Sequence, residues 1–258
     1  MLPRAKKSFG QNFLIDDSVV KKIIEAADIQ KGETVLEIGP GTGLLTGALV
    51  AAGAHVVAIE LDHDLIQPLK EKFGDSIELI EGDVLKMDVN RIIDDSRAFK
   101  LVANIPYNIT SSVIERFLSH NPRPTRMILM VQKEVADRIL AKPPHMSLLS
   151  VVSQFYAYCS RVTNVKAGSF RPIPKVDSAV VRFDLRASPT CNGVEERIIR
   201  LAKLGFSHPR KQLQNNLSAY LAPSKIKTIM ESMCLNPKIR AEELTIEDWI
   251  YLNRFLSK

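Results

Sequence analysis

The chain has 258 residues, 45% of them hydrophobic, and a formal net charge of +6, which favours a polyanionic partner. Its length suits one large and one small globular domain, and its hydrophobic content excludes a disordered chain. No window approaches the ~20 apolar residues of a membrane span, and the three separated cysteines match no metal-ligand spacing, so we expect a cytoplasmic protein without a metal.

Short β-branched runs alternate with amphipathic stretches through the first 185 residues. Strands are predicted at 34–38, 55–60, 77–81, 100–103, 126–131 and 178–185. Helices are predicted at 16–27, 43–52, 62–73 and 111–119, with Asp62 and Ser111 as N-caps of the last two. This alternation predicts an α/β fold with βαβ units and a mainly parallel sheet.

The composition changes to small, turn-forming residues at 188–193, and every later segment has helical spacing. We therefore predict two domains, 1–187 and 188–258. Helices are expected at 194–206, 210–220, 223–233 and 245–257, the last opened by a capping box from Thr245 to Asp248. From residue 187 onward there are 11 Lys and Arg against 7 Asp and Glu, so much of the excess positive charge belongs to the helical domain.

The stretch VLEIGPGTG at 35–43 reads as a strand, a glycine-rich turn and the start of a helix. Glycines let a ligand approach the backbone, and the helix N-terminus offers unpaired N–H groups, so a cofactor site is predicted. The dinucleotide fingerprint requires a glycine where this chain has Leu44, which argues against a nicotinamide oxidoreductase. Glu37 would repel a pyrophosphate and better suits a cationic or zwitterionic ligand.

The ends of four successive predicted strands carry Gly39, Glu60, Asp83 and Asn104, in that order. Open α/β sheets bind ligands along the edge where parallel strands end. A carboxylate at position 60 can accept hydrogen bonds from ribose hydroxyls, and one at position 83 from an adenine amine. A ligand that combines adenosine, a positive centre and an amino-acid tail is S-adenosylmethionine.

The sequence NIPY at 104–107 indicates the chemistry of the acceptor. The exocyclic amine of adenine is a weak nucleophile because its lone pair is delocalised into the ring. The side-chain oxygen of Asn104 and the carbonyl of Ile105 or Pro106 can accept both amine protons and localise that lone pair, and Tyr107 can stack on the base.

Several motifs together resemble the ribosomal RNA adenine dimethyltransferases, most closely the bacterial branch that acts on small-subunit rRNA. The motifs are KSFGQNFL (7–14), EIGPGTG (37–43), AIELD (58–62), GDVL (82–85), NIPYNIT (104–110), MVQKEVADR (130–138) and SFRPIPKVDSAVVRF (169–183). The resemblance implies a class I methyltransferase, with a Rossmann-like domain, an N-terminal lid segment and a small all-α domain that contacts rRNA.

The resemblance also implies roles for single residues. Those implied to bind S-adenosylmethionine, with S-adenosylhomocysteine as product, are Gln11, Asn12, Leu14, Gly39, Gly41, Glu60, Leu61, Asp83, Val84 and Asn104. Tyr107 and Phe170 would sandwich a flipped adenine, with Phe170 in an exposed loop. Those expected to contact RNA are Arg171, Lys175, His208, Arg210 and Lys211, although Pro209 departs from the family pattern and can begin a helix there. Asp177 is expected to anchor a turn.

The activity that the resemblance implies is dimethylation of the N6 amines of two adjacent adenosines in the 3′-terminal hairpin loop of 16S rRNA. A monomer acting on a partly assembled 30S particle, late in subunit biogenesis, is expected. The alternatives are the antibiotic-resistance branch that dimethylates large-subunit (23S) rRNA, a methylase of DNA adenine or glutamine, and an assembly factor that acts mainly by binding the pre-subunit.

Overall fold

The structure, a computed structural model, describes residues 3, 5–6, 9–93, 98–187, 194–218 and 220–256. Two compact units are present. The first comprises Met1–Ala136 with Ala157–Leu185, and the second comprises Asp137–Tyr156 with Arg186–Lys258. The predicted boundary and the turn-forming stretch at 188–193 lie outside the described residues, and the sequence did not predict the grouping of 137–156 with the C-terminal helices.

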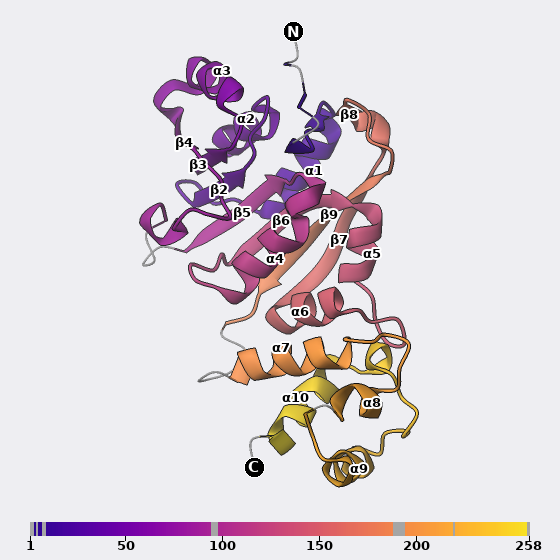
Figure 1. Ribbon diagram of the computed structural model, residues 1–258. Coiled ribbons are helices and arrows are strands. Elements are labelled where there is room, and N and C mark those ends of the chain that lie inside the picture. Colours follow the sequence, from indigo (N-terminus) through magenta and orange to yellow (C-terminus); the bar gives the residue numbers. More distant parts are fainter. Residues whose placement is uncertain are drawn as a thin grey trace. The chain divides into compact units, whose positions relative to one another are not determined.

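The first unit is built on a seven-stranded sheet (Figure 1). In spatial order its strands are β4 (Ile77–Glu81), β3 (His55–Glu60), β2 (Thr34–Ile38), β5 (Phe99–Asn104), β6 (Arg126–Gln132), β9 (Ser178–Leu185) and β7 (Ala157–Val165). The strands from β4 to β6 are parallel, whereas β9 runs antiparallel to both β6 and β7. The predicted mainly parallel sheet is confirmed, and each predicted strand is present.

Strand β7 was not predicted, because it lies at the edge of the sheet and most of its side chains are partly exposed. Its sequence, AYCSRVTNV, therefore lacks the continuous apolar run by which buried parallel strands are recognised. A strand that is half open to water carries a weaker sequence signal than a central one.

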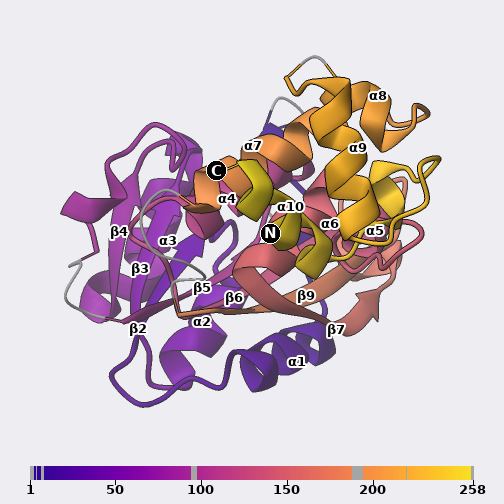
Figure 2. The ribbon, with the colours of Figure 1, turned by 90° about the horizontal axis from the view of Figure 1, so that it is seen from below.

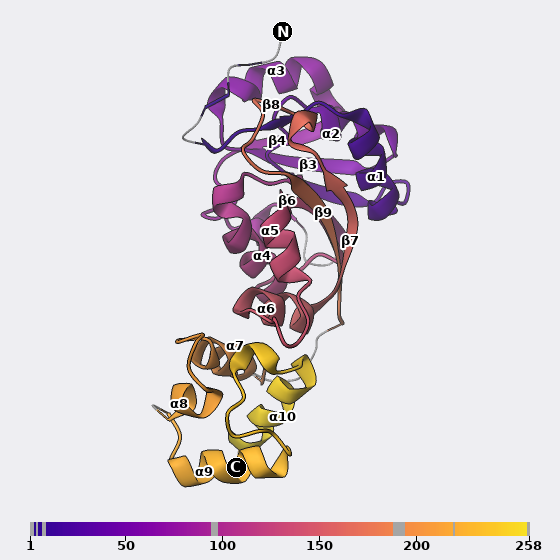
Figure 3. The same cartoon turned by 90° about the vertical axis from the view of Figure 1, so that its right-hand side faces the viewer.

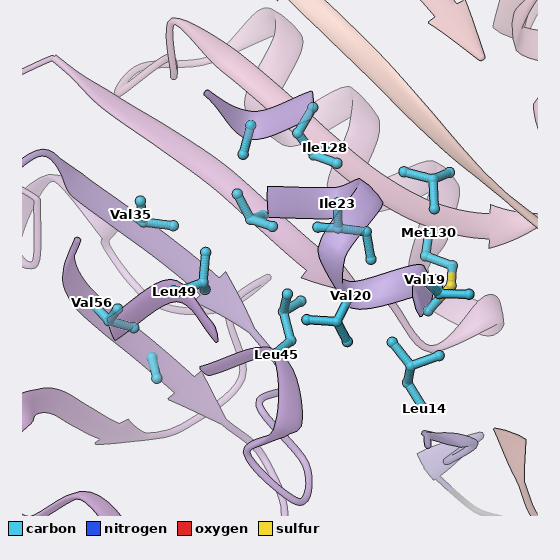
Figure 4. Close-up of a cluster of buried hydrophobic side chains, with 14 of the residues drawn as sticks. Leu14, Val19, Val20, Ile23, Val35, Leu45, Leu49, Val56, Ile128 and Met130 are labelled. Carbon is cyan, nitrogen blue, oxygen red and sulfur yellow. The ribbon is translucent and has the colours of Figure 1, made fainter. Parts of the chain in front are cut away.

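Helices cover both faces of the sheet. They are α1 (Asp17–Ala27), α2 (Leu44–Ala51), α3 (His63–Phe73) and α4 (Thr110–Ser119). Figure 2 shows α1 and α2 on one face and α4 on the other. The apolar side of α1 presents Val19, Val20 and Ile23 to Ile128 and Met130 of the sheet (Figure 4). Burying each such side chain contributes roughly 1.5–3 kcal/mol, so this face fixes α1 against the strands.

The two predicted N-caps have different outcomes. Asp62 caps α3, because its side chain accepts a hydrogen bond from the N–H of Asp64 at 3.2 Å. Ser111 is not a cap: a 3₁₀ turn at Tyr107–Ile109 runs directly into α4, which begins at Thr110. No extended residue precedes that helix, so the geometry of a side-chain cap does not arise.

A second, two-stranded sheet joins the N-terminal segment to a distant part of the chain. Strand β1 (Phe13–Leu14) pairs antiparallel with β8 (Phe170–Arg171), with Leu14 opposite Phe170. Figure 3 shows β8 beside the N-terminal segment. This pairing over about 150 residues of sequence was not predicted.

The second unit is helical. Its helices are α6 (Leu148–Tyr156), α7 (Val194–Gly205), α8 (Leu213–Leu217), α9 (Pro223–Ser232) and α10 (Ile246–Leu256), and α5 (Lys133–Ile139) leads into it. Helix α6 packs on α7 and α10, which explains why residues 137–156 belong to this unit. Trp249 is fully buried beside Phe206 and fits because Gly205 has no side chain.

The capping box predicted before the last helix is confirmed. The N–H of Thr245 donates to the Asp248 carboxylate at 2.9 Å, and the N–H of Asp248 donates to the Thr245 hydroxyl at 3.1 Å. The helix predicted over 210–220 is wrong at its start, since only Leu213–Leu217 is helical. Pro209 lies instead in a turn closed by a hydrogen bond from the Lys211 N–H to the His208 carbonyl.

Among the described residues, no helix is both long and apolar enough to cross a membrane.

Candidate active site

The predicted ligand residues lie at the carboxyl edge of the parallel strands. Gly39 follows β2, Glu60 ends β3, Asp83 follows β4, and Asn104 ends β5. Since these four strands are adjacent and parallel, the order β4-β3-β2-β5 brings their ends to one side of the sheet. The predicted alignment of four strand ends is therefore present.

A pocket opens at this edge, and we call it the donor pocket. Its lining residues are Phe9, Gln11, Phe13, Ile38, Gly39, Gly41, Ile59, Glu60, Leu61, Gly82, Asp83, Val84, Pro106, Asn108 and Ile109. Seven of the residues predicted to bind the cofactor are among them. Four further lining residues were not predicted, although the motifs FGQNFL and NIPYNIT contain them: Phe9, Phe13, Asn108 and Ile109.

The glycine-rich turn needs glycine for conformation and for space. Gly39 and Gly41 have φ angles of 67° and 60°, which other residues rarely adopt. A Cβ atom on Gly41 would lie 3.2 Å from the ring of Phe13. The turn thus presents bare backbone to the donor pocket, with the ring of Phe13 packed closely against Gly41.

Glu60 ties the glycine turn to the end of β3. Its two carboxylate oxygens accept from the N–H groups of Gly41 at 3.1 Å and Asp62 at 2.8 Å. Burial raises the pKa of Glu60, and these backbone hydrogen bonds partly oppose that rise. Each carboxylate oxygen has a second lone pair, so the group can also accept from two hydroxyls of a ligand.

Glu37 does not repel a ligand in the donor pocket, so the prediction that it disfavours a pyrophosphate is wrong. Glu37 is 1% exposed and does not line the donor pocket. Burial, partly offset by the neighbouring Thr46 hydroxyl, raises the pKa of Glu37 to about 8, so the side chain is mostly protonated at neutral pH. In the protein without a ligand, Glu37 is therefore mostly uncharged and does not repel the pyrophosphate group of a dinucleotide.

Asp83 lies in the loop after β4, where its carboxylate accepts from the N–H of Leu85 at 3.0 Å. Lys86 lies 3.4 Å from the other carboxylate oxygen. These contacts fix a carboxylate on the wall of the donor pocket beside Val84, where it can accept from an amine of a ligand.

The N-terminal segment is held over this edge of the sheet. The Lys6 ammonium lies 2.5 Å from Asp62 and 2.6 Å from Asp64, and the Gln11 amide donates to Asp62 at 2.7 Å. Burial opposes ionisation of Asp62, but hydrogen bonds from Lys6 and Gln11 lower its pKa below the ordinary value. The contacts of Lys6 and Gln11 with Asp62 therefore hold the N-terminal segment in a position where Phe9 lines the donor pocket.

A second pocket, which we call the acceptor pocket, adjoins the first. Its lining residues are Gly10, Gln11, Asn12, Phe13, Asn104, Ile105, Pro106 and Tyr107. Gln11, Phe13 and Pro106 line both pockets. The Asn104 amide nitrogen donates to the Asn12 carbonyl at 3.1 Å, which leaves its side-chain oxygen as the atom that can accept from a ligand.

The carbonyls of Ile105 and Pro106 are not equivalent. The Pro106 carbonyl accepts from the N–H of Ile109 at 3.1 Å and closes the 3₁₀ turn. The turn and loop hydrogen bonds among the described residues include none to the Ile105 carbonyl. The Ile105 carbonyl is therefore the one of the two that is left able to accept from a ligand.

Tyr107 is half-buried, and its hydroxyl lies 2.7 Å from the hydroxyl of Ser178. Burial raises the pKa of Tyr107, and the hydrogen bond to Ser178 opposes that rise. Ser178 is fully buried as the first residue of β9, between Gln132 of β6 and Val165 of β7. The hydrogen bond thus fixes the ring of Tyr107 to the sheet.

Two predicted site residues lie in the hydrophobic core. Phe170 is fully buried in β8, so the expectation of an exposed loop aromatic is wrong, and stacking on a base would require the β1–β8 pair to rearrange. Leu14 is 5% exposed and packs in the same cluster (Figure 4), so only its main chain can face a ligand. Both side chains are buried because β1 pairs with β8.

The predicted RNA-contacting residues are exposed, but they belong to two units. Arg171 ends β8 and Lys175 lies between β8 and β9, where Asp177 accepts from the Ala167 N–H at 3.0 Å and anchors the turn as expected. In the second unit His208, Arg210 and Lys211 are exposed residues of the turn before α8. The described residues contain no cluster of His, Cys, Asp and Glu that could hold a metal ion.

Comparison with known proteins assigns the family. The family model described as ribosomal RNA adenine dimethylase matches residues 3–258. The chain belongs to this family. It is thus an S-adenosylmethionine-dependent rRNA adenine dimethyltransferase with the class I methyltransferase fold.

Individual relatives agree with this assignment. The chain is 39% identical over 268 residues to a ribosomal RNA small subunit methyltransferase A from Rippkaea orientalis, which covers 99% of this chain and 98% of the relative. A dimethyladenosine transferase from Plasmodium falciparum has a TM-score of 0.81 at 29% identity, covering 93% of this chain and 95% of that one. A 23S rRNA methyltransferase, ErmE, has a TM-score of 0.78 at 28% identity, covering 96% and 100%. The chain is therefore similar both to a methyltransferase of small-subunit rRNA and to a methyltransferase of 23S rRNA.

Proposed function

We propose that this protein dimethylates the N6 amines of two adjacent adenosines in the 3′-terminal hairpin loop of small-subunit rRNA. The observation that carries the proposal is the position of Asn104 in the acceptor pocket, beside the donor pocket, with its amide nitrogen held by the Asn12 carbonyl. Relatives about 40% identical over nearly the whole chain are small-subunit rRNA methyltransferases, which supports that subunit over the large one.

The donor pocket has the chemistry that S-adenosylmethionine requires. The bare backbone of Gly39 and Gly41 admits the amino-acid portion, the Glu60 carboxylate accepts from the ribose hydroxyls, and Asp83 accepts from the adenine amine. Leu61 and Val84 offer apolar surface to the adenine ring. When bound, the cofactor supplies a methyl group on a positively charged sulfur.

The acceptor pocket holds the nucleophile. The Asn104 side-chain oxygen and the Ile105 carbonyl accept the two protons of the target amine, so its lone pair is localised and directed toward the donor pocket. These oxygens also stabilise the positive charge that develops on the nitrogen during transfer. Alignment of the amine by two fixed acceptors therefore accounts for the catalysis without a strong general base, since the methylated, positively charged nitrogen is acidic enough to release its extra proton to water.

The target adenine must leave its stack before its amine can enter the acceptor pocket, at a cost of a few kcal/mol. The ring of Tyr107 is positioned by Ser178 to stack on the extruded base, and such stacking contributes about 1–3 kcal/mol. We propose that Arg171 and Lys175 contact phosphates near the target. His208, Arg210 and Lys211 would contact phosphates elsewhere on the rRNA.

The proposal extends to the form of the substrate. A hairpin within a partly assembled 30S particle offers phosphates to exposed basic residues of both units, and a cytoplasmic monomer suits that substrate. The salt dependence of rRNA affinity tests this view. Affinity falls as the salt concentration rises, and a variant that loses one phosphate contact should show a less steep fall.

The decisive experiment maps modified nucleotides by mass spectrometry in rRNA from cells with and without the gene. We expect two adjacent dimethyladenosines in small-subunit rRNA that disappear when the gene is deleted. In parallel, the purified protein is given partly assembled 30S particles, naked 16S rRNA and naked 23S rRNA. Methylation confined to 23S rRNA would contradict the proposal. If cells with an inactive Asn104→Ala protein matured their small subunits normally, the main role of the protein would be to bind the pre-subunit.

A further inference from the structure

A short surface loop beside the acceptor pocket combines apolar and basic side chains. The rim loop, as we call Arg171–Val176, consists of the last residue of β8 and the residues that follow it toward β9, and has the sequence RPIPKV. Ile173 and Val176 are 61% and 46% exposed, although both are large hydrophobic residues. Arg171 and Lys175 are exposed as well, so basic and apolar residues alternate along the loop.

The rim loop is held in place at both ends. At its start β8 pairs with β1, and the Arg171 guanidinium donates to the carbonyls of Gly168 and Phe170. At its end the Asp177 carboxylate accepts from the Ala167 N–H. Two prolines, Pro172 and Pro174, restrict the backbone between these anchors. Little conformational entropy is left for the loop to lose on binding a partner.

The loop is positioned at the reactive edge of the sheet. Strand β9 begins with Ser178, which lies opposite Gln132, the last residue of the antiparallel neighbour β6. Strand β6 in turn runs parallel to β5, which ends at Asn104. The Ser178 hydroxyl also contacts Tyr107 directly, so the rim loop leads into the wall of the acceptor pocket.

The chemistry of the loop indicates which partner fits it. Among the ion pairs between described residues, none involves Arg171 or Lys175. A single RNA strand offers phosphates to such cations and base faces to Ile173 and Val176. Apolar side chains that enter between bases are known to hold nucleic acid in an unstacked form.

We propose that the rim loop is a wedge for the RNA: Ile173 and Val176 pack against the bases that flank the extruded adenosine, while Arg171 and Lys175 contact the adjoining phosphates. This inference rests on the proposed function and adds to it two apolar residues that stabilise the flipped state. The wedge fills the gap that the target base leaves, so the base returns to its stack less readily.

The test compares two RNA substrates with the Ile173→Ser, Val176→Ser double variant. One is the intact hairpin, and the other is the same RNA with abasic sites on both sides of the target, so that unstacking is already complete. On the hairpin we expect kcat/KM to fall about tenfold, the equivalent of ~1.4 kcal/mol of the unstacking cost. On the abasic RNA the variant should match the wild type.

Tyr158→Ser is the matched control. Tyr158 is 64% exposed and lies in the same unit, but it pairs with Asp184 near the far end of β9. It should leave kcat/KM unchanged on both RNAs. Calorimetric titration of S-adenosylmethionine should give wild-type affinity for all variants, because none of the altered residues lines the donor pocket.

Equal losses on both RNAs, or no loss on the hairpin, would overturn the wedge while the proposed function stands. A wild-type protein that methylates neither RNA would overturn the proposed function and the wedge with it. Losses confined to the hairpin support the inference.

Discussion

The donor and acceptor sides of the site are built differently. On the donor side, Gly39, Glu60 and Asp83 lie within two residues of a regular strand, and the Glu60 carboxylate bonds to backbone N–H groups only 2 and 19 residues away. On the acceptor side, the bonds that orient Asn104 and Tyr107 span 92 and 71 residues. The strand ends of the parallel sheet therefore place the carboxylates of the donor side, whereas the bonds that orient the acceptor side join distant segments of the chain.

The largest expected effect tests the acceptor side. Asn104→Ala removes one of the two proposed acceptors for the target amine, so kcat should fall about 10²- to 10³-fold, as when one group that stabilises transition-state charge is lost. Steady-state kinetics with rRNA would measure this.

Asn108 provides the contrast within the same motif, because it lines the donor pocket but not the acceptor pocket. Asn108→Ala should raise KM for S-adenosylmethionine more than it lowers kcat. If the two variants had the same kinetic pattern, the division of the site into two sides would be wrong.

Glu37, in β2 just before the glycine turn of the donor side, keeps its proton in the folded protein. Burial raises the pKa of Glu37 from 4.5 to about 8, so folded protein binds a proton that the unfolded chain releases. Stability contributed by this group is therefore lost as pH rises from about 4.5 to about 8, by on the order of a few kcal/mol.

Glu37→Gln mimics the protonated side chain and should remove this pH dependence. Urea unfolding of both proteins at pH 5 and pH 8.5 would give the free energies of unfolding. The difference between variant and wild type should grow with pH in favour of the variant, and parallel curves would refute a neutral Glu37.

The cofactor contact of Glu60 should give a smaller effect. Glu60→Gln weakens hydrogen bonds to a charged group, each worth ~1.5–3 kcal/mol, so affinity for S-adenosylmethionine should fall roughly 10- to 150-fold by calorimetric titration. Glu81 is the natural control, since it is opposite Glu60 on β4 but does not line the donor pocket. An equal loss in Glu81→Gln would show that general charge, rather than a direct contact, sets the affinity.

The smallest effect concerns the long-range bond on the acceptor side. Ser178→Ala removes the hydrogen bond to Tyr107 and should lower kcat roughly 3- to 10-fold, in line with ~0.5–1.5 kcal/mol for such a bond. In a Tyr107→Phe background the same change should have no further effect. Additive losses in kcat from Ser178→Ala and Tyr107→Phe would show that Ser178 acts independently of Tyr107. As a control, Ser153→Ala removes another fully buried serine hydroxyl and should leave kcat unchanged.

The sequence by itself determined the parallel strands, most helices of the first unit, and the residues at four strand ends. Continuous apolar runs and helical spacing are local signals, and parallel pairing brings successive strand ends to one edge. Tertiary structure alone decided that Phe170 is buried, that Ser178 holds Tyr107, and that residues 137–156 join the C-terminal helices. Those outcomes depend on β1 pairing with β8 and on α6 packing against α7 and α10, and contacts between residues so far apart in sequence leave no periodic pattern in either segment.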